Sequence, residues 1–390
     1  MERHMQIKEN VALIDKVIFG GITIVDIENM EELVTRGVIE QGKTNTPYYT
    51  ESWQQFSRLT IEHDGVIDKM VAGGKSLKGL PVSYCTLECN VKNQGYGNLA
   101  CYTVEDYAAR LKEIQQHLLS EYGILTDFTY IKVKEIEINR TFKLDGEFVD
   151  YHRAITVLMN NLPTYLKSQM EYMKVEQNSV EYETYYATSK KTNKSKRYLL
   201  LKIYNKSKAL ENIVLLTDSY MRVEFRLIGT EKIKKDLGSY IFKELTDQII
   251  NKYFDNQVQK LIVGPLQKWQ QSRDKYLINL MKQQRQDDIR HWQTNVLRIL
   301  QNEEIKQKRP ILLDIEELIP LVDQLKLNSK RKSDVKKNFR KQAQKYETVF
   351  CAGDRQKLNE IVDKLTVKAA DKVVEIPARC PDHDGMAKSA

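Results

Sequence analysis

Three segments with two-residue alternation of apolar and polar side chains, 131–139, 197–205 and 220–228, most constrain the fold of this chain. Residues two apart on a strand share a face, so each segment predicts a strand with one apolar and one polar side. The polar sides carry Glu135, Glu137 and Asn139 in the first segment, Lys202 and Tyr204 in the second, and Arg222, Glu224 and Arg226 in the third. If these sides face the same way in one antiparallel sheet, carboxylates, cations and a tyrosine converge.

The rest of the chain predicts an α+β fold. Further strand-like segments lie at 11–24, 57–63, 81–91 and 180–189, and from about residue 230 the pattern is helical and highly charged. We therefore expect an N-terminal domain with a mainly antiparallel central sheet flanked by helices, followed by an all-helical C-terminal region. The expected limits are 1–250 for a catalytic domain, 251–370 for a helical DNA-binding or accessory domain, and 371–390 for a flexible tail.

Two helices are predicted within the first domain. The first spans about 103–121, because Thr103 and Asp106 have capping-box spacing and Gly123 follows as a stop. Its helically spaced apolar residues, expected to pack on the apolar side of the sheet, are Val104, Tyr107, Ala108, Leu111, Ile114, Leu118 and Leu119. The second covers 151–173 and is expected to be interrupted by Pro163.

Basic residues are concentrated near the C-terminal end. The chain has 61 Lys and Arg against 53 Asp and Glu, yet residues 326–346 hold nine Lys or Arg and a single acid, Asp334. This density is suitable for binding a phosphate backbone, although a solvated helix face is the simpler alternative. We predict a pair of helices at 314–325 and from about Ser333. The first has an apolar stripe of Ile315, Leu318, Ile319 and Val322, and the second turns Val335 and Phe339 inward. The candidate DNA-binding cations are Lys330, Arg331, Lys336, Lys337, Arg340 and Lys341.

Composition narrows the class of protein. No run of about 18 apolar residues is present, and the charged N-terminus lacks the apolar core of a signal peptide. The five cysteines are odd in number and have no paired metal-ligand spacing, which favours free thiols in a reducing cytoplasm. We expect a cytoplasmic protein without a membrane partner, and none of the six histidines is assigned a role.

The convergent polar set has the groups needed to cut a phosphodiester. A tyrosine oxygen can attack phosphorus and keep the strand as a phosphotyrosine. Carboxylates bind Mg²⁺ or Mn²⁺ through hard oxygen atoms, and Arg and Lys neutralise charge in the transition state. The alternative is a solvated sheet face held by cross-strand Arg–Glu pairs.

The segments "YIKVKEIEINRTF", "RYLLLKIYNKSKAL" and "SYMRVEFRLIG" together resemble rolling-circle replication initiators. The resemblance is to those of filamentous phages (the gene II and gene X type) and of small Gram-positive plasmids, and it spans roughly 11–250. It implies Glu137 and Glu224 as carboxylate ligands of Mg²⁺ or Mn²⁺, with Glu135 as a third candidate. Tyr204, followed by Asn205 and Lys206, occupies the Tyr-Asn-Lys position and is the first candidate nucleophile. Tyr186 is the second candidate, and Lys206 and Arg222 complete the catalytic set.

The chain departs from this pattern at two positions. Glu135 stands where an Arg is usual and Glu137 where an Asp is usual, so the local charge is more negative. A His-hydrophobe-His motif is missing from the sequence, which implies a site built on carboxylates alone.

The resemblance implies a protein that binds the origin of a plasmid or phage and nicks one DNA strand. Its partners would be double-stranded origin DNA and single-stranded DNA. Lys202 and Arg226 are further candidate DNA-binding residues. A host helicase and a second copy of the chain are candidate protein partners. Two alternatives remain open: a relaxase-type mobilisation nickase, and a non-catalytic, sequence-specific DNA-binding protein. An RNA-binding protein fits less well, because the stacking aromatics of sheet-based RNA readers are missing from the sequence.

Overall fold

The computed structural model describes most of the chain, and its parts group into two compact units. Unit 1 comprises residues 1–144, 188–255 and 368–390, and unit 2 comprises 145–187 and 256–367. The expected functional domains, 1–250 and 251–370, stay a prediction. The described residues are 3–9, 11–27, 39–41, 48–50, 58–61, 85–90, 101–166, 175–176, 179–180, 184–188, 199–210, 215–216, 218–307, 309–346, 353–367 and 372–379.

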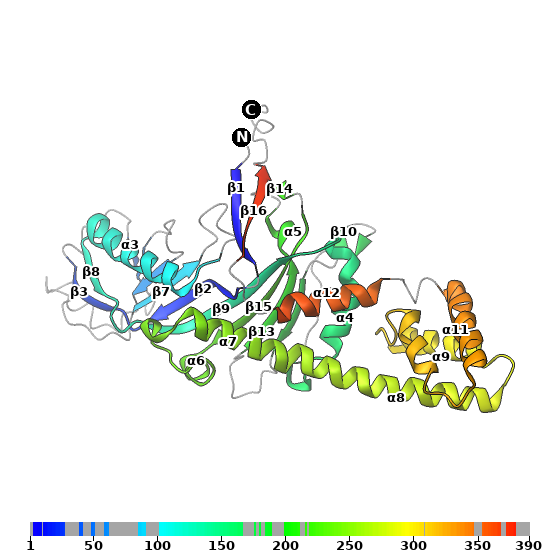
Figure 1. Ribbon diagram of the computed structural model, residues 1–390. Coiled ribbons are helices and arrows are strands. Elements are labelled where there is room, and N and C mark those ends of the chain that lie inside the picture. The colour runs from blue at the N-terminus through cyan, green and yellow to red at the C-terminus, as the bar shows by residue number, and fades with distance from the viewer. Residues whose placement is uncertain are drawn as a thin grey trace. The chain divides into compact units, whose positions relative to one another are not determined.

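Unit 1 is built on an antiparallel sheet, which confirms the predicted fold class (Figure 1). Adjacent strands follow the order β13-β15-β9-β2-β7-β6-β5-β4. Their bounds are β13 (Leu199–Asn205), β15 (Tyr220–Ile228), β9 (Lys132–Lys143), β2 (Leu13–Gly20), β7 (Cys85–Asn90), β6 (Arg58–Ile61), β5 (Tyr48–Thr50) and β4 (Ile39–Gln41). The prediction for 220–228 matches β15 residue for residue, while residues 197 and 198 of the second predicted strand lie outside the described part.

Smaller elements complete unit 1. Two further sheets pair β1 (Arg3–Glu9) with β16 (Lys372–Arg379) and β14 (Leu215–Leu216), and β3 (Thr23–Ile27) with β8 (Ile124–Asp127). β16 thus lies inside the segment expected as a tail. The helices are α3 (Val104–Tyr122), α5 (Lys206–Leu210), α6 (Thr230–Leu237), η5 (Phe242–Glu244) and α7 (Asp247–Val258), of which α7 crosses the limit between the units.

The apolar face of the sheet forms the core of unit 1. Cross-strand pairing aligns Leu201, Phe225, Ile138 and Ile14 in one row, and all four are buried. The Phe225 ring meets Phe254 of α7 edge-on, with 5.2 Å between ring centroids. Burying each such side chain contributes about 1.5–3 kcal/mol, so this face is the main source of stability for the sheet.

Helix α3 forms as predicted. Thr103 and Asp106 make the reciprocal capping box, and Gly123 ends the helix with φ 62°. The Tyr107 ring lies 6.3 Å from the Phe242 ring, which in turn lies 5.1 Å from Phe19 of β2. Ala108 and Leu119, predicted as core residues, are exposed. The buried stripe of α3 is therefore narrower than the set of apolar residues from which the helix was predicted. Ala108 borders a cavity.

Unit 2 is mainly helical (Figure 1). Its elements are η3 (Phe148–Tyr151), α4 (His152–Asn160), η4 (Thr164–Leu166), the hairpin β10 (Val175–Glu176) with β11 (Ser179–Val180), β12 (Thr184–Thr188) at its limit, the π-helical turn η6 (Gln259–Val263), α8 (Gly264–Asp287), α9 (Trp292–Gln307), η7 (Ile315–Glu317), α10 (Ile319–Val322), α11 (Ser329–Ala343), η8 (Gln344–Tyr346) and α12 (Asp354–Thr366). Helix α4 ends before Pro163, as predicted, and the end of the expected helix at 167–173 lies outside the described residues.

The predicted helix pair differs from the structure in two ways. The segment 314–325 is not one helix but the turn η7 followed by the short α10. Pro320 explains the break, because proline lacks the N–H and its ring clashes with the carbonyl four residues earlier. Helix α11 begins at Ser329, four residues before the predicted Ser333, because the Asn328 side chain accepts a hydrogen bond from the Arg331 N–H and caps it. The inward positions Val335 and Phe339 are confirmed.

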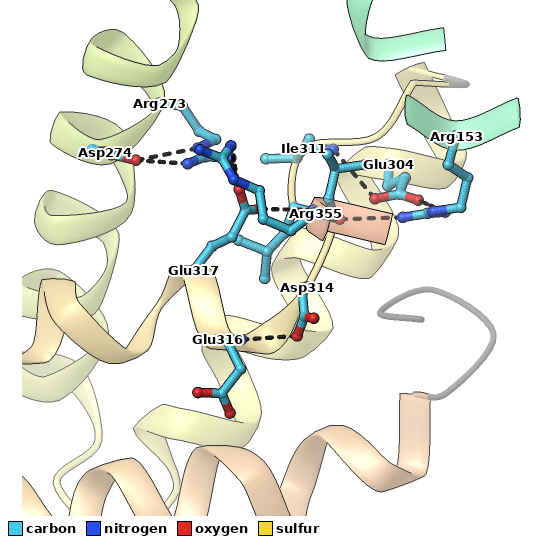
Figure 2. A network of polar contacts seen from close by, with 11 residues as sticks. Arg153, Arg273, Asp274, Glu304, Ile311, Asp314, Glu316, Glu317 and Arg355 are labelled. Atoms are coloured by element: carbon cyan, nitrogen blue, oxygen red, sulfur yellow. Dashed lines mark hydrogen bonds and ion pairs between the residues drawn. The ribbon is translucent and has the colours of Figure 1, made fainter. Parts of the chain in front are cut away.

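Ion pairs in unit 2 hold its helices together (Figure 2). Glu317 of η7 accepts from Arg273 of α8 at 2.8 Å and from Arg355 of α12 at 3.0 Å. Arg153 of α4 lies 2.7 Å from Glu304 of α9 and also contacts α12. Removing one partner of such a buried pair is costly, so these contacts tie four helices and η7 into one body. Among the described helices of the chain, none is long and apolar enough to cross a membrane.

Candidate metal centre and tyrosine site

A β-bulge in β2 brings Asp15 onto the polar face of the sheet. Ile14 pairs with Ile138 and Lys16 pairs with Glu137, which leaves Asp15 as the extra residue between them. A bulge breaks the strict alternation and turns the extra side chain to the side of its neighbour, here Lys16. The Tyr107 hydroxyl of α3 donates to the Asp15 carbonyl at 3.0 Å, and Ile14 exchanges two backbone hydrogen bonds with Tyr102. These contacts fix the bulge.

Three carboxylates meet at this point. Asp15 of β2, Glu137 of β9 and Glu224 of β15 each offer an oxygen atom, and the three atoms lie within 4.8 Å of one another. This confirms the expectation that Glu137 and Glu224 lie close together. Carboxylate oxygen atoms are the ligands that Mg²⁺ and Mn²⁺ prefer, so these three residues could hold one such ion. Asp15 Oδ1 is buried and has no hydrogen-bond partner among the described residues, as expected of an atom prepared for a cation.

The electrostatics of the cluster favour binding of positive charge. Burial, together with the charge of Glu224, raises the pKa of Glu137 to about 7. Burial also raises the pKa of Glu224, which is 3 % exposed, while nearby Lys202 opposes the rise. Arg222 compensates part of the negative charge, since its Nη1 lies 3.1 Å from Asp15 Oδ2 and its Nε donates to Thr141 at 2.7 Å. Lys202 and Lys206 act on Glu224, and Arg226 acts on Glu137, so further positive charge surrounds the cluster.

Tyr204 stands beside this cluster. Its hydroxyl lies 3.5 Å from Glu224 Oε2, and the ammonium groups of Lys202 and Lys206 lie 4.0 Å and 5.9 Å from its ring centroid. The side chain is only 6 % exposed, and burial raises the pKa of the hydroxyl well above 10. Burial lowers the pKa of the Lys206 ammonium to about 8. Tyr204 is therefore protonated at neutral pH, with a carboxylate in position to take its proton.

The other predicted sheet residues pair with one another. Arg226 Nη2 lies 2.5 Å from Glu135 Oε1, and Arg226 Nε lies 3.4 Å from Glu137 Oε1. Glu135 is thus neutralised by an arginine and is not one of the three clustered carboxylates. Arg226 and Lys202, predicted to contact DNA, both have partners within the site.

Tyr186, the second candidate nucleophile, lies on β12 and is half-buried. Its neighbour Tyr185 points the other way along the strand, is buried, and has its hydroxyl 2.6 Å from Nδ1 of His152 in unit 2. This contact fixes the strand that carries Tyr186, and it gives His152 a structural partner that the sequence did not suggest.

The predicted cations of α11 fall into two groups. Lys336 and Arg340 are engaged with Asp323 and Glu316 of the same unit. Lys330, Arg331, Lys337 and Lys341 are exposed, and no ion pair joins them to another described residue.

Asp15 is the site residue that the sequence analysis missed. Strict alternation along 13–19 places it with Leu13, Val17 and Phe19, which looks like a core position. The available signal was the acid itself, since a charged residue within "ALIDKVIFG" is expensive to bury in an apolar face. Such an acid indicates either a bulge or an ion pair, and both are present here.

A separate cavity of about 580 Å³ lies in unit 1 beside α3 and η5. Its apolar floor includes Leu111, Phe128 and Phe242. The carboxylate cluster and Tyr204 do not line it, so this cavity has no part in the chemistry considered below.

Comparison with known proteins gives little further information. No protein-family model and no curated protein sequence matches the chain. Among solved structures, a rolling-circle replication initiator protein from Geobacillus stearothermophilus is similar, with a TM-score of 0.34 and 10% sequence identity over 65% of this chain and 85% of that chain. Similarity of this size is compatible with a distant relation only and carries no residue roles to this chain.

Proposed function

We propose that this protein nicks and rejoins one strand of DNA, with a tyrosine as nucleophile and Mg²⁺ or Mn²⁺ as cofactor, to start rolling-circle replication of a plasmid or phage. The observation that carries the proposal is the group of three carboxylates within 4.8 Å with the Tyr204 hydroxyl 3.5 Å from one of them. A carboxylate-rich metal site next to a tyrosine and an arginine has the parts needed for phosphodiester transesterification.

Asp15, Glu137 and Glu224 would hold the metal ion, which when bound polarises the scissile phosphate. The Tyr204 hydroxyl gives its proton to Glu224, and its oxygen forms the new bond to phosphorus. The bond from phosphorus to the leaving deoxyribose oxygen breaks, and that oxygen takes a proton from water. Arg222 and Lys206 supply positive charge beside the reacting groups. The phosphotyrosine keeps the energy of the broken bond, so the reverse attack rejoins the strand.

The burial of Tyr204 favours two alternatives to Tyr204 as the nucleophile. The hydroxyl of a tyrosine that is only 6 % exposed reaches a phosphorus atom only if its neighbours move aside. Tyr186, which is half-buried, is therefore the second candidate for the same role. The same burial also favours a non-catalytic, sequence-specific DNA-binding protein that keeps the site as structure. A relaxase-type mobilisation nickase would use the same chemistry on a different DNA.

The proposal includes the following partners and location. The protein would act in the cytoplasm on double-stranded origin DNA and on the single strand that it cuts, with a host helicase and a second copy of the chain as further partners. Residues 1–250 would carry the nicking and joining reaction, and 251–370 would be the DNA-binding or accessory part.

The test is a covalent adduct. Protein is incubated with Mn²⁺ and a supercoiled plasmid that carries the origin of the element encoding the chain, and the products are separated under denaturing conditions. We expect a protein–DNA adduct that Tyr204→Phe abolishes, that Glu224→Gln abolishes without loss of DNA affinity, and that the exposed control Tyr130→Phe keeps. Loss of the adduct in Tyr186→Phe alone moves the nucleophile to β12. Binding without an adduct in any form of the protein overturns the proposal in favour of the non-catalytic alternative.

A further inference from the structure

Helix α11 presents three lysines on the side opposite its buried face. Val335, Phe339 and Ala343 point into the core of unit 2, where Phe339 meets the Trp292 ring edge-on at 5.5 Å. At 3.6 residues per turn, Lys337 lies about half a turn around the helix from Phe339. Lys330 and Lys341, seven residues before and four after Lys337, share its direction, and all three are exposed. We call Lys330, Lys337 and Lys341 the lysine stripe.

A second group of cations on α11 serves the fold. Lys336 Nζ lies 2.8 Å from Asp323 Oδ2, and Lys332 Nζ donates to the Asp323 carbonyl at 2.6 Å. Arg340 makes a two-pronged contact with the Glu316 carboxylate, at 2.6 Å and 2.8 Å. The Glu316 backbone is itself held by Asp314 (Figure 2). These contacts join the edge of α11 to η7 and to the end of α10, so Lys336 and Arg340 each have an acidic partner within unit 2.

The chemistry of the lysine stripe selects its partner. The stripe is about 16 Å long, at 1.5 Å per residue, and one exposed acid, Asp334, lies on the same face between Lys330 and Lys337. It has no aromatic ring on which an unpaired base could stack and no apolar residue that could enter a membrane. A lysine can also pair with guanine O6 and N7, but the stripe has no Arg, Asn or Gln, whose planar groups make the two-pronged contacts with base edges. Lysine alone supplies point charges for phosphate oxygen atoms.

We propose that the lysine stripe binds the phosphate backbone of duplex DNA without reading its sequence. This inference rests on the proposed action on DNA, and it differs from the expectation that α11 is a recognition helix whose Lys336 and Arg340 contact DNA. Sequence recognition must then come from other residues, and the stripe contributes affinity and register.

Two double variants of equal charge test this inference. Lys337→Ala with Lys341→Ala removes two lysines of the stripe, and Lys336→Ala with Arg340→Ala removes two cations of the fold from the same turns. Binding to a fluorescent 30-base-pair duplex of random sequence is measured by anisotropy from about 50 to 300 mM NaCl. Circular dichroism confirms that both variants are folded.

Each lost phosphate contact lowers the slope of log affinity against log salt by about 0.9, so the stripe variant should lose about 1.8. The fold variant should keep the slope within about 0.3 while its melting temperature falls. Origin duplex and random duplex should lose affinity by the same factor. An unchanged slope in the stripe variant, or a loss confined to origin duplex, overturns the inference, as does equal loss in both variants. Nicking of a single-stranded substrate, measured alongside, reports on the proposed function separately, because neither double variant alters the carboxylate site.

Discussion

Replacing Glu137 with Gln should stabilise unit 1 at neutral and higher pH when no divalent metal is present. Burial and the charge of Glu224 raise the pKa of Glu137 from 4.5 to about 7. The folded chain thus holds this proton at a pH where the unfolded chain has released it. The free energy of unfolding therefore falls as pH rises from about 4.5 to about 7, and the cost is complete above pH 7.

At 1.36 kcal/mol per pKa unit, this cost amounts to about 3 kcal/mol. Glu137→Gln keeps the shape and removes the ionisation, so the variant should gain up to about 3 kcal/mol at pH 8 and little at pH 5. Arg226 loses its contact with Glu137 but keeps Glu135 at 2.5 Å, so the substitution leaves no arginine without a partner. Saturating metal reverses the order of stability, because free Mn²⁺ at about 1,000 Kd stabilises the wild-type protein by about 4.1 kcal/mol.

The assay is native-state hydrogen exchange by mass spectrometry with EDTA at pH 5.5 and pH 8, after correction for the intrinsic exchange rates. Peptides from β9 and β15 report the opening free energy of the sheet itself, which matters in a chain with two compact units. Glu113→Gln, a substitution on the exposed face of α3, is the control and should change neither value. Equal pH dependence in the wild-type and Glu137→Gln proteins would refute the electrostatic argument, as would equal stabilisation of both by Mn²⁺.

Three further substitutions should have distinct effects. Asp15→Ala should lower the free energy of unfolding by about 3–5 kcal/mol, because fully buried Arg222 loses its carboxylate partner. An unchanged free energy by hydrogen exchange would contradict this and show that Glu224 alone balances the charge of Arg222. Phe339→Ala should lower the free energy of unfolding of unit 2 by about 3–5 kcal/mol and change the fluorescence of Trp292, whose ring Phe339 contacts. A loss below about 1 kcal/mol in urea unfolding would contradict the packing described. Thr103→Ala should cost about 1 kcal/mol by removing the cap of α3, with faster exchange confined to its first turn as the expected signature.

The sequence predicted the strands and helix starts that depend on residues close together in the chain. Alternation along 220–228 is enough to define β15, because one of its faces is consistently apolar. The start of α3 follows from Thr103 and Asp106, whose capping box is a contact within four residues. Glu137 and Glu224 could be placed together since paired antiparallel strands bring their polar faces to one side.

The remaining features depend on contacts that no local pattern shows. Asp15 joins the site through a bulge held by Tyr107, a residue 92 positions away in sequence. Glu135 looked equivalent to Glu137 in the sequence. In the structure Glu135 pairs with Arg226 at 2.5 Å and is not one of the three clustered carboxylates. A solvated polar face was the alternative prediction, but Arg222 and Tyr204 are buried in this face. Exposure of a sheet face depends on what covers it, and alternation along a strand holds no information about that.

The central claim is that Asp15, Glu137 and Glu224 form a divalent metal site, and anomalous X-ray diffraction from crystals soaked in Mn²⁺ tests it most directly. The site described here predicts an anomalous difference peak within about 2.2 Å of one oxygen atom from each carboxylate, and loss of that peak in Glu224→Gln. Ordered carboxylates with no peak between them, or a peak that persists in Glu224→Gln, would contradict the claim and leave the cluster as a buried acidic group neutralised by protons and the neighbouring Arg and Lys side chains.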